Sequence, residues 1–412
     1  MKNQDNLEFE INPIRLTYLL DLYKLSKENF LKLIQGSNKK SVIGIDDLNQ
    51  ILNKQKKVNL PLLKKIDTIF EKGITWYISN RDLPDRKNLS IFFRKDKFNA
   101  ELNLGSIKKI EEFERKNTEI KILCDKIGYR AEKKFNFSLT DNPKKVSEII
   151  KSQFNLKKES LIKRNILKKT NSDRDYLENL IRIFEEFNIF VFEFIDKKRK
   201  EELVSNFNGF FMKPNLIVLK RQQDYLKREI FTLLHEFAHY LIDEEEIDAQ
   251  IGEILIEKQN NIEKWCNNFA YNFLIGEYDD LINNLDNATI KNSFHEEKLN
   301  EISNITHLST LALYTRLVII NKISNSNYNE IKNKIYESIY KEKEKKKFEL
   351  ALEKEKAEAN GEKIFISSPK PIESNLLKEI VRINYFEGNV SESKAMETLG
   401  LKNKPFEEVL YS

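Results

Sequence analysis

Cysteine is scarce in this 412-residue chain, which has only Cys124 and Cys266 and no C-x-x-C pair. Two isolated thiols exclude a disulfide framework and a cysteine-based zinc site, and they suit a reducing compartment. No apolar run approaches the roughly 18 residues that a transmembrane helix needs, and the first ten residues lack the apolar stretch of a signal peptide. We therefore expect a cytoplasmic protein without a membrane partner.

Glycine and proline are also few, with 11 and 8 residues, and this shortage disfavours a fold built on tight β-turns. Net charge is small as well, because 70 basic and 65 acidic residues leave only +5, too little to mark the whole chain as a nucleic-acid binder. Hydrophobic residues make up 40% of the chain, which is enough for packed cores. Since 412 residues exceed one typical core, we predict a mainly α (α+β) fold with several domains.

Histidine is rare too, yet two of the four histidines, His235 and His239, stand in one H-E-x-x-H motif with Glu236 between them. Chance would produce this motif in roughly one such chain in a few hundred. Apolar side chains from 226 to 241 recur at helical spacing, so the motif is expected on a helix. The two imidazoles then project from one helix face and can share a metal ion, and Glu236 can reach a water beside it.

Zinc needs a third protein ligand in such a site, and two placements are conceivable. The layout H-E-x-x-H-x-x-G-x-x-H requires a glycine turn at position 242 and a ligand at position 245. The chain has Ile242 and Glu245 there, and isoleucine resists the sharp turn that glycine permits. This layout therefore fails, and the ligand is expected from a following helix.

Glu263 is the preferred third ligand, because it lies 24 residues after His239 on an amphipathic helix predicted for residues 261–274. Asn267 follows one turn later on the same face and can hydrogen-bond to a ligand side chain. Glu253 and Glu257 stay open as other candidates for the ligand. Two imidazoles and one carboxylate suit Zn²⁺, and the same donor set can take Mn²⁺ or Fe²⁺.

Three segments, in this order, resemble the ImmA/IrrE family of metallopeptidases. F-T-L-L-H-E-F-A-H at 231–239 is similar to the family's F-T-L-A-H-E-hydrophobic-x-H signature. E-K-W-C-N-N-F-A at 263–270 is similar to its E-x-x-A-N-x-F-A segment, with Cys266 in place of alanine, and L-S-T-L-A-L-Y-T-R-L at 308–317 to its V-S-x-x-A-x-x-x-R-L helix. The resemblance covers roughly residues 130–340. It implies regulated proteolysis of a cytosolic regulator, often linked to stress, mobile elements or phage.

The N-terminal region resembles the Xre-like helix-turn-helix that precedes the peptidase in many relatives. Helical spacing predicts helices over residues 14–25, 27–34, 45–52 and 61–70. Two features depart from the family, because the acidic-x-glycine turn is replaced by Asn53-Lys54-Gln55 and residues 35–46 look like an insertion. Lysines near the expected recognition helix could contact DNA: Lys54, Lys56, Lys57, Lys64 and Lys65.

The predicted domain organisation has five parts. They are a helix-turn-helix-like domain at 1–85, a helical linker at 86–130 with a short strand at 90–94, a zincin-like metallopeptidase domain at 131–340, a charged helix or linker at 341–373 and a C-terminal helical unit at 374–412. Inside the peptidase domain we expect helices at 143–154 and 176–187, a buried strand at 189–195 and a hairpin at 209–219.

The leading functional hypothesis is a zinc-dependent endopeptidase that cleaves a regulatory protein. His235, His239 and Glu263 would hold the metal, and Glu236 would act as the general base. The group that stabilises the oxyanion is open among four residues: Tyr240, His295, His307 and Arg316. The alternatives are a DNA-binding regulator whose peptidase domain is a sensor or inactive, and a toxin–antitoxin or phage-defence component that acts through protein contact.

Overall fold

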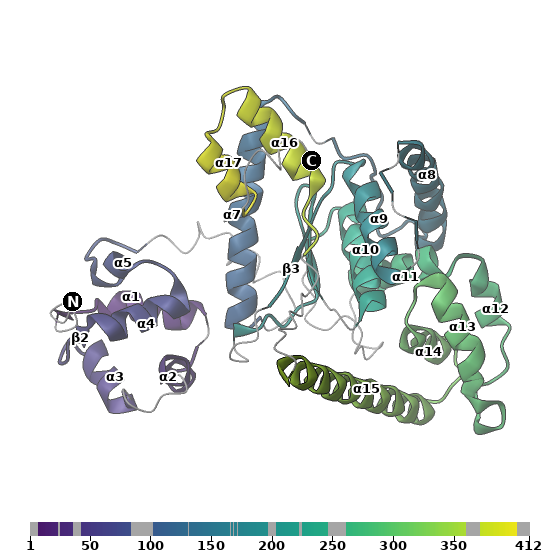
Figure 1. Cartoon of the computed structure of the whole chain (residues 1–412), viewed down its shortest axis with the longest axis horizontal. Helices are drawn as coiled ribbons and strands as arrows, with labels where there is room; N and C mark the ends of the chain where they lie inside the picture. Colours follow the sequence, from purple (N-terminus) through teal and green to yellow (C-terminus); the bar gives the residue numbers. More distant parts are fainter. Residues whose placement is uncertain are drawn as a thin grey trace. The chain divides into compact units, whose positions relative to one another are not determined.

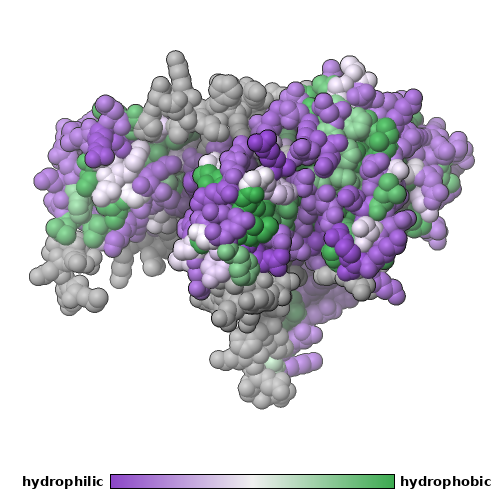
Figure 2. Space-filling view, turned by 90° about the horizontal axis from the view of Figure 1, so that it is seen from above, coloured by the Kyte–Doolittle hydropathy of each residue, from purple (hydrophilic) through white to green (hydrophobic). Residues whose placement is uncertain are grey.

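The computed structural model describes most of the chain, as two compact units. The described residues are 7–23, 25–35, 43–83, 102–130, 132–164, 166–167, 169–170, 172–196, 203–221, 225–245, 261–359 and 371–401. One unit comprises residues 1–116 and 196–207, and the other comprises residues 117–195 and 208–412. The predicted class, mainly α with a small sheet, is confirmed. None of the described helices is long and apolar enough to cross a membrane, and the face shown in Figure 2 is largely hydrophilic.

The first unit is a small helical bundle with a two-stranded ribbon. Its helices are α1 (Pro13–Leu22), α2 (Lys27–Gln35), α3 (Ile45–Leu52), α4 (Leu60–Phe70), α5 (Ile74–Ile78) and the first part of α7 (Leu104–Lys126). The ribbon pairs β1 (Glu8–Phe9) with β2 (Val58–Asn59) in antiparallel fashion. The four helices expected from the sequence are present, whereas the ribbon and α5 were not predicted. The strand expected at 90–94 lies outside the described residues.

Asparagine caps and aromatic packing explain the bundle. The Asn12 and Asn59 side chains accept hydrogen bonds from the first turns of α1 and α4, each of which contains a proline. Phe70 at the end of α4 stacks on Tyr23 and Phe30, with ring centroids 5.5 and 5.6 Å apart. These contacts join α1, α2 and α4 around one core, while the identity of the bundle as a helix-turn-helix stays a prediction.

A three-stranded sheet forms part of the core of the second unit. Its strands lie in the order β3-β5-β4 and comprise Phe190–Phe194, Leu216–Lys220 and Gly209–Met212, respectively. β4 and β5 form the predicted antiparallel hairpin, and β3 pairs with β5 in parallel, with Phe192 opposite Val218. All residues of these strands except Lys220 are buried, so both faces of the sheet are covered.

Helix α10 (Leu226–Ile242) carries the H-E-x-x-H motif at the centre of this unit. It packs against the sheet on one side and against α11 (Asn261–Ile275) on another, and α11 in turn packs against α8 (Pro143–Lys163), as Figure 1 shows. Helix α9 (Asp173–Glu185) contacts both α10 and β3. Every α10 residue from 232 to 242 is buried. A helix that is covered on all sides belongs to the core, so its polar residues need a specific reason to be there.

The remaining elements of this unit follow α11 in the chain. They are η4 (Gly276–Tyr278), α12 (Asp279–Asn283), η5 (Ile290–His295), α13 (Glu296–Thr306), α14 (Thr310–Ile319), α15 (Asn325–Ala359), α16 (Asn375–Phe386) and α17 (Glu392–Thr398). Helix α15 is continuous across residue 340, where the sequence suggested a domain boundary. The predicted domain boundaries stay predictions.

A buried charge cluster joins the sheet to α9 and α10. Glu193 on β3 accepts two hydrogen bonds from Arg174 of α9, at 2.7 and 2.9 Å, and lies 3.6 Å from the guanidinium of Arg221. Burial raises the pKa of the Glu193 carboxyl, but hydrogen bonding with Glu229 of α10 and with Arg174 outweighs burial and holds the pKa below its usual value. The cluster therefore ties the start of α10 to the strand beside it.

The C-terminal helices are joined to the same unit by polar contacts. The backbone amide of Ile372 donates to Glu193 Oε2 at 2.6 Å, and the Ser374 hydroxyl at the start of α16 donates to Glu185 at 2.9 Å. The fully buried Asn384 side chain donates to the Leu123 carbonyl of α7 at 2.9 Å. Because buried polar groups require partners, these bonds fix where the tail docks.

Phe237, inside the H-E-x-x-H motif, is predicted to be a major source of stability. Its ring is fully buried, with centroids 4.6 Å from Phe184 and 5.6 Å from Phe154. Phe237→Ala should lower the free energy of unfolding of this unit by about 3–5 kcal/mol, because it removes a large ring from a packed core. Phe348→Ala on α15, where the ring is 65% exposed, should change it by less than about 0.5 kcal/mol. Denaturant titration compares them, and equal effects would contradict the central role of α10.

Candidate metal centre

Two adjacent helices bring together His235, His239 and Glu263. The histidines lie one turn apart on α10, and Glu263 lies in the first turn of α11, which packs against α10. All three side chains are buried, with residue exposures of 0%, 1% and 6%. One ligand atom from each lies within 4.8 Å of the others, so the described residues contain a three-residue group that could hold a metal ion.

The spacing of these atoms fits a tetrahedral ion. The Nε2 atoms of His235 and His239 are 3.2 Å apart, and they lie 3.1 and 3.3 Å from Glu263 Oε2 and Oε1, respectively. A tetrahedral zinc ion with bonds of about 2.0–2.1 Å separates its ligand atoms by about 3.3–3.4 Å. Each Nε2 therefore lies about one such edge from the other Nε2 and from one oxygen of Glu263, and the two histidines face different oxygens of that carboxylate. The residues therefore fit the metal that the motif implies.

Asn267 orients one of the histidines. Its Oδ1 lies 2.9 Å from His235 Nδ1, one turn of α11 beyond Glu263. An amide oxygen accepts only, so the contact places a proton on Nδ1, and Nε2 is the ring nitrogen that can bind a metal once it is deprotonated. This is the tautomer that binds a metal through Nε2.

The electrostatics of the site favour a charged Glu263. Burial raises the pKa of its carboxyl, but the nearby imidazoles of His235 and His239 outweigh burial and hold the pKa well below its usual range. Glu263 is therefore a carboxylate at neutral pH. An anionic oxygen beside two imidazole nitrogens is a donor set suited to a divalent cation.

Glu236 lies on a part of α10 that the sheet approaches closely. It is 2% exposed, and Gly209 at the start of β4 passes beside it. A Cβ added at Gly209 would lie 2.7 Å from Thr232 Cγ2, 2.9 Å from the Val218 carbonyl and 3.3 Å from Glu236 Cγ. Glycine at 209 therefore permits this strand to pack against the turn of helix that presents Glu236.

The rival third ligands are placed differently. Glu245, the residue at the ligand position of the rejected layout, accepts a hydrogen bond from the Lys213 backbone amide at 2.6 Å, beside the β4–β5 turn. Glu253 and Glu257 lie outside the described residues. Among the described glutamates that the sequence offered, Glu263 is the one grouped with the two histidines.

The four candidates for the oxyanion-stabilising group have structural partners. Tyr240 stacks on Phe237 in the core, with ring centroids 5.7 Å apart. The His295 ring lies 3.0 Å from a backbone carbonyl, His307 pairs with Asp173 at 2.7 Å, and Arg316 lies 3.7 Å from Asp279 and over the Tyr271 ring. These contacts give each side chain a role in packing or capping, and none of them points to catalysis.

Sequence reasoning missed the charge cluster around Glu193. The signal was a single glutamate in the otherwise apolar strand F-V-F-E-F at 190–194. A lone charge in a buried strand predicts a buried cationic partner, because an unpaired charge there would be very costly. That partner is Arg174. It could not be predicted from the sequence, because the pairing depends on how α9 packs against β3.

A sheet in front of an H-E-x-x-H helix, with a glutamate from the next helix, defines a zincin-like arrangement. Residues 184–287, from the end of α9 through α12, match the family model of the peptidase M78 family, described as an IrrE N-terminal-like domain. The match includes all five predicted site residues and supports both the resemblance to the ImmA/IrrE family and a peptidase in general. No match was found among curated proteins or among solved structures.

The metal content of ligand variants tests the site. Wild type should carry about one equivalent of zinc, His239→Ala should lose it while staying folded, and Glu263→Ala should retain it poorly. Glu253→Ala and Glu257→Ala are the matched controls and should keep the metal. Mass spectrometry of the purified proteins measures each. Full metal in Glu263→Ala together with loss in a control variant would show that the third ligand is a different glutamate.

Proposed function

We propose that this protein is a cytoplasmic zinc-dependent endopeptidase of the ImmA/IrrE family that cleaves a regulatory protein. The observation that carries the proposal is the buried group of His235, His239 and Glu263, in which one ligand atom of each residue lies within 4.8 Å of the others. The match of residues 184–287 to a peptidase family supports it independently of the geometry.

His235, His239 and Glu263 would hold the metal, and three protein ligands leave one position open for substrate or water. A zinc ion held there would polarise the scissile carbonyl and make a water molecule easier to deprotonate. Asn267 fixes the ring of His235 in the required orientation. Mn²⁺ and Fe²⁺ can use the same donor set, so the identity of the ion is part of the proposal.

Glu236 would act as the general base that takes a proton from the attacking water. It follows His235 directly in the helix, so its side chain is rotated by about 100° from the metal-binding histidine and can reach the open side of the site. Its carboxylate would accept a proton from the attacking water and pass it to the amine that leaves. Burial keeps the carboxylate away from bulk solvent.

The proposed substrate is a folded regulator or an exposed segment of one. The support is the resemblance to the ImmA/IrrE family, which implies proteolysis of a cytosolic regulator. The substrate can be sought with the protein itself, because a variant that binds but does not cleave should retain it.

Glu236→Gln should abolish cleavage without removing the metal. The substitution keeps the three ligands but removes the proton acceptor, so the rate should fall by about 10²–10⁴-fold. Proteins captured from a cell extract by Glu236→Gln serve as substrates, and Glu244→Gln, an exposed glutamate just beyond the helix, is the control. The appearance of cleavage fragments is measured by gel and mass spectrometry. Equal cleavage rates for wild type and Glu236→Gln would show that Glu236 is not the proton acceptor.

A second proposal is that the first unit contacts DNA. The five lysines predicted for this role are exposed, between the end of α3 and the middle of α4. Lys54 pairs with Glu10 at 3.4 Å and Lys56 with Asp47 at 2.5 Å, which reduces the positive charge available to phosphate. Lys57 and Lys64 make no ion pair within the described residues, so these two lysines would contact the DNA phosphates.

Gel-shift titration over a range of salt concentrations tests DNA contact. Each phosphate contact adds about 0.9 to the slope of log affinity against log salt, so Lys57→Ala with Lys64→Ala should reduce the slope by about 2. Lys158→Ala on α8 is the control and should leave it unchanged. Unaltered binding in the double variant would rule out this surface, and binding without sequence preference that vanishes at moderate salt would reduce the contact to non-specific attraction.

A further inference from the structure

A second pocket lies at the C-terminal end of α11, apart from the metal centre. It has a volume of about 640 Å³ and is lined by residues of α8, α9, α11, η4, α12 and α13, all within the second unit. Its nearest α11 residue, Asn272, is nine residues beyond Glu263, or about 14 Å along the helix axis. The pocket is therefore separate from the metal centre, and its volume suits a small organic molecule.

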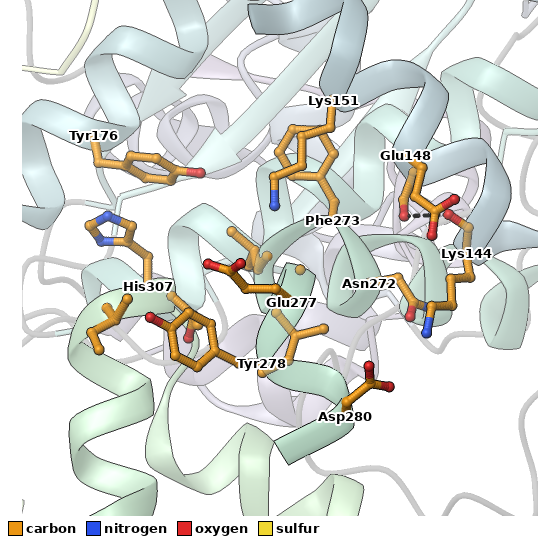
Figure 3. A pocket seen from close by; sticks show the side chains of 16 residues that line it. Lys144, Glu148, Lys151, Tyr176, Asn272, Phe273, Glu277, Tyr278, Asp280 and His307 are labelled. Atoms are coloured by element: carbon orange, nitrogen blue, oxygen red, sulfur yellow. Dashed lines mark hydrogen bonds between the residues drawn. The ribbon is translucent and has the colours of Figure 1, made fainter. Parts of the chain in front are cut away.

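The inner wall of the pocket presents hydrogen-bond donors. Lys151 of α8 points its ammonium into the space, and the Tyr176 hydroxyl is directed at the same region (Figure 3). Lys151 makes no ion pair or hydrogen bond with the described residues, and burial lowers the pKa of its ammonium although Glu277 partly offsets this. A half-buried ammonium without a close anion is a costly arrangement that an anionic ligand would relieve.

Acidic groups also line the pocket. Glu148, Glu277 and Asp280 line the pocket and are exposed to solvent. Glu277 is near enough to raise the pKa of the Lys151 ammonium, yet no ion pair joins the two. The pocket thus offers a half-buried cation and exposed carboxylates in one lining. Such a lining disfavours a ligand with several negative charges and suits one that carries a carboxylate and an ammonium close together.

Aromatic rings form the rest of the wall. The Lys151 ammonium lies 5.8 Å from the centre of the Phe273 ring. Tyr176 stacks on His307, with ring centroids 3.8 Å apart and an angle of 15° between the planes. Asp173 holds His307 through a 2.7 Å contact with Nδ1, which fixes the stack. Rigid rings beside the charged groups suit a flat apolar side chain.

We propose that this pocket binds a free amino acid with an aromatic side chain, its carboxylate on Lys151 and Tyr176 and its ammonium beside Glu277. The ring of the ligand would lie against Phe273 and the stacked pair of Tyr176 and His307. The pocket takes this ligand whether or not the metal centre cleaves peptides, because the two sites share no residue.

Isothermal titration with three matched probes tests the proposal. L-phenylalanine has both charges, 3-phenylpropionate lacks the ammonium, and phenethylamine lacks the carboxylate. The full-length protein should bind phenylalanine at least about tenfold more tightly than either analogue, since each analogue leaves one pocket charge unmatched. An absence of binding by all three, or equal binding of phenylalanine and phenethylamine, overturns the proposal.

Two variants, Lys151→Met and Glu277→Gln, test which side chains contact the ligand. Lys151→Met keeps the length of the side chain but removes the charge, and it should weaken phenylalanine binding by about tenfold or more, while Lys145→Met, an exposed position on the same helix, should not. Glu277→Gln should weaken phenylalanine and spare 3-phenylpropionate. Lys151→Met should melt no lower than wild type without ligand, because it removes a half-buried charge. Unchanged phenylalanine affinity in Lys151→Met would show that the carboxylate does not bind there.

Discussion

The burial of α10 on every side is the constraint on which the second unit depends. The sheet, α9 and α11 all pack against this helix, so its polar residues cannot be solvated by water. His235, Glu236 and His239 are nevertheless in that environment, and Glu263 comes from the neighbouring helix to join them. A buried carboxylate between two imidazoles is stable only if the charges are balanced. A divalent cation would balance them, so the same packing that stabilises the fold also brings together residues that could hold a metal ion.

The local parts of this fold could be predicted from the chain. Apolar spacing located α10, α11 and the β4–β5 hairpin, and Pro61 and Pro143 marked helix starts, because helix periodicity and capping are properties of short segments. His235 and His239 could be proposed because a fixed spacing in a helix fixes a common face, and Glu263 could be proposed from its place on the amphipathic helix that follows. The structure brings these three side chains close together, as proposed. Their roles in metal binding and catalysis stay predictions.

The parts that depend on distant contacts could not be predicted. The parallel pairing of β3 with β5 joins two strands separated by the whole of β4, and nothing in either strand specifies which edge it joins. The same holds for Arg174 as the partner of Glu193 and for the ribbon of β1 with β2. The second pocket is built by five helices and a short 3₁₀ segment, so no single stretch of sequence contains its pattern. Such features are set by packing, which periodicity does not encode.

The hydrogen bond between Ile372 and Glu193 also affects the order in which the chain can fold during synthesis. The two residues are 179 positions apart, so a ribosome finishes the sheet, α10 and the metal ligands long before it makes the residue that completes the charge cluster. During that interval the contacts of Glu193 with Arg174, Arg221 and Glu229 must stabilise it without the Ile372 amide. Closure of such a long loop comes late in folding. The charge cluster is therefore complete only after residue 372 has been synthesised, well after the candidate metal ligands on α10 and α11.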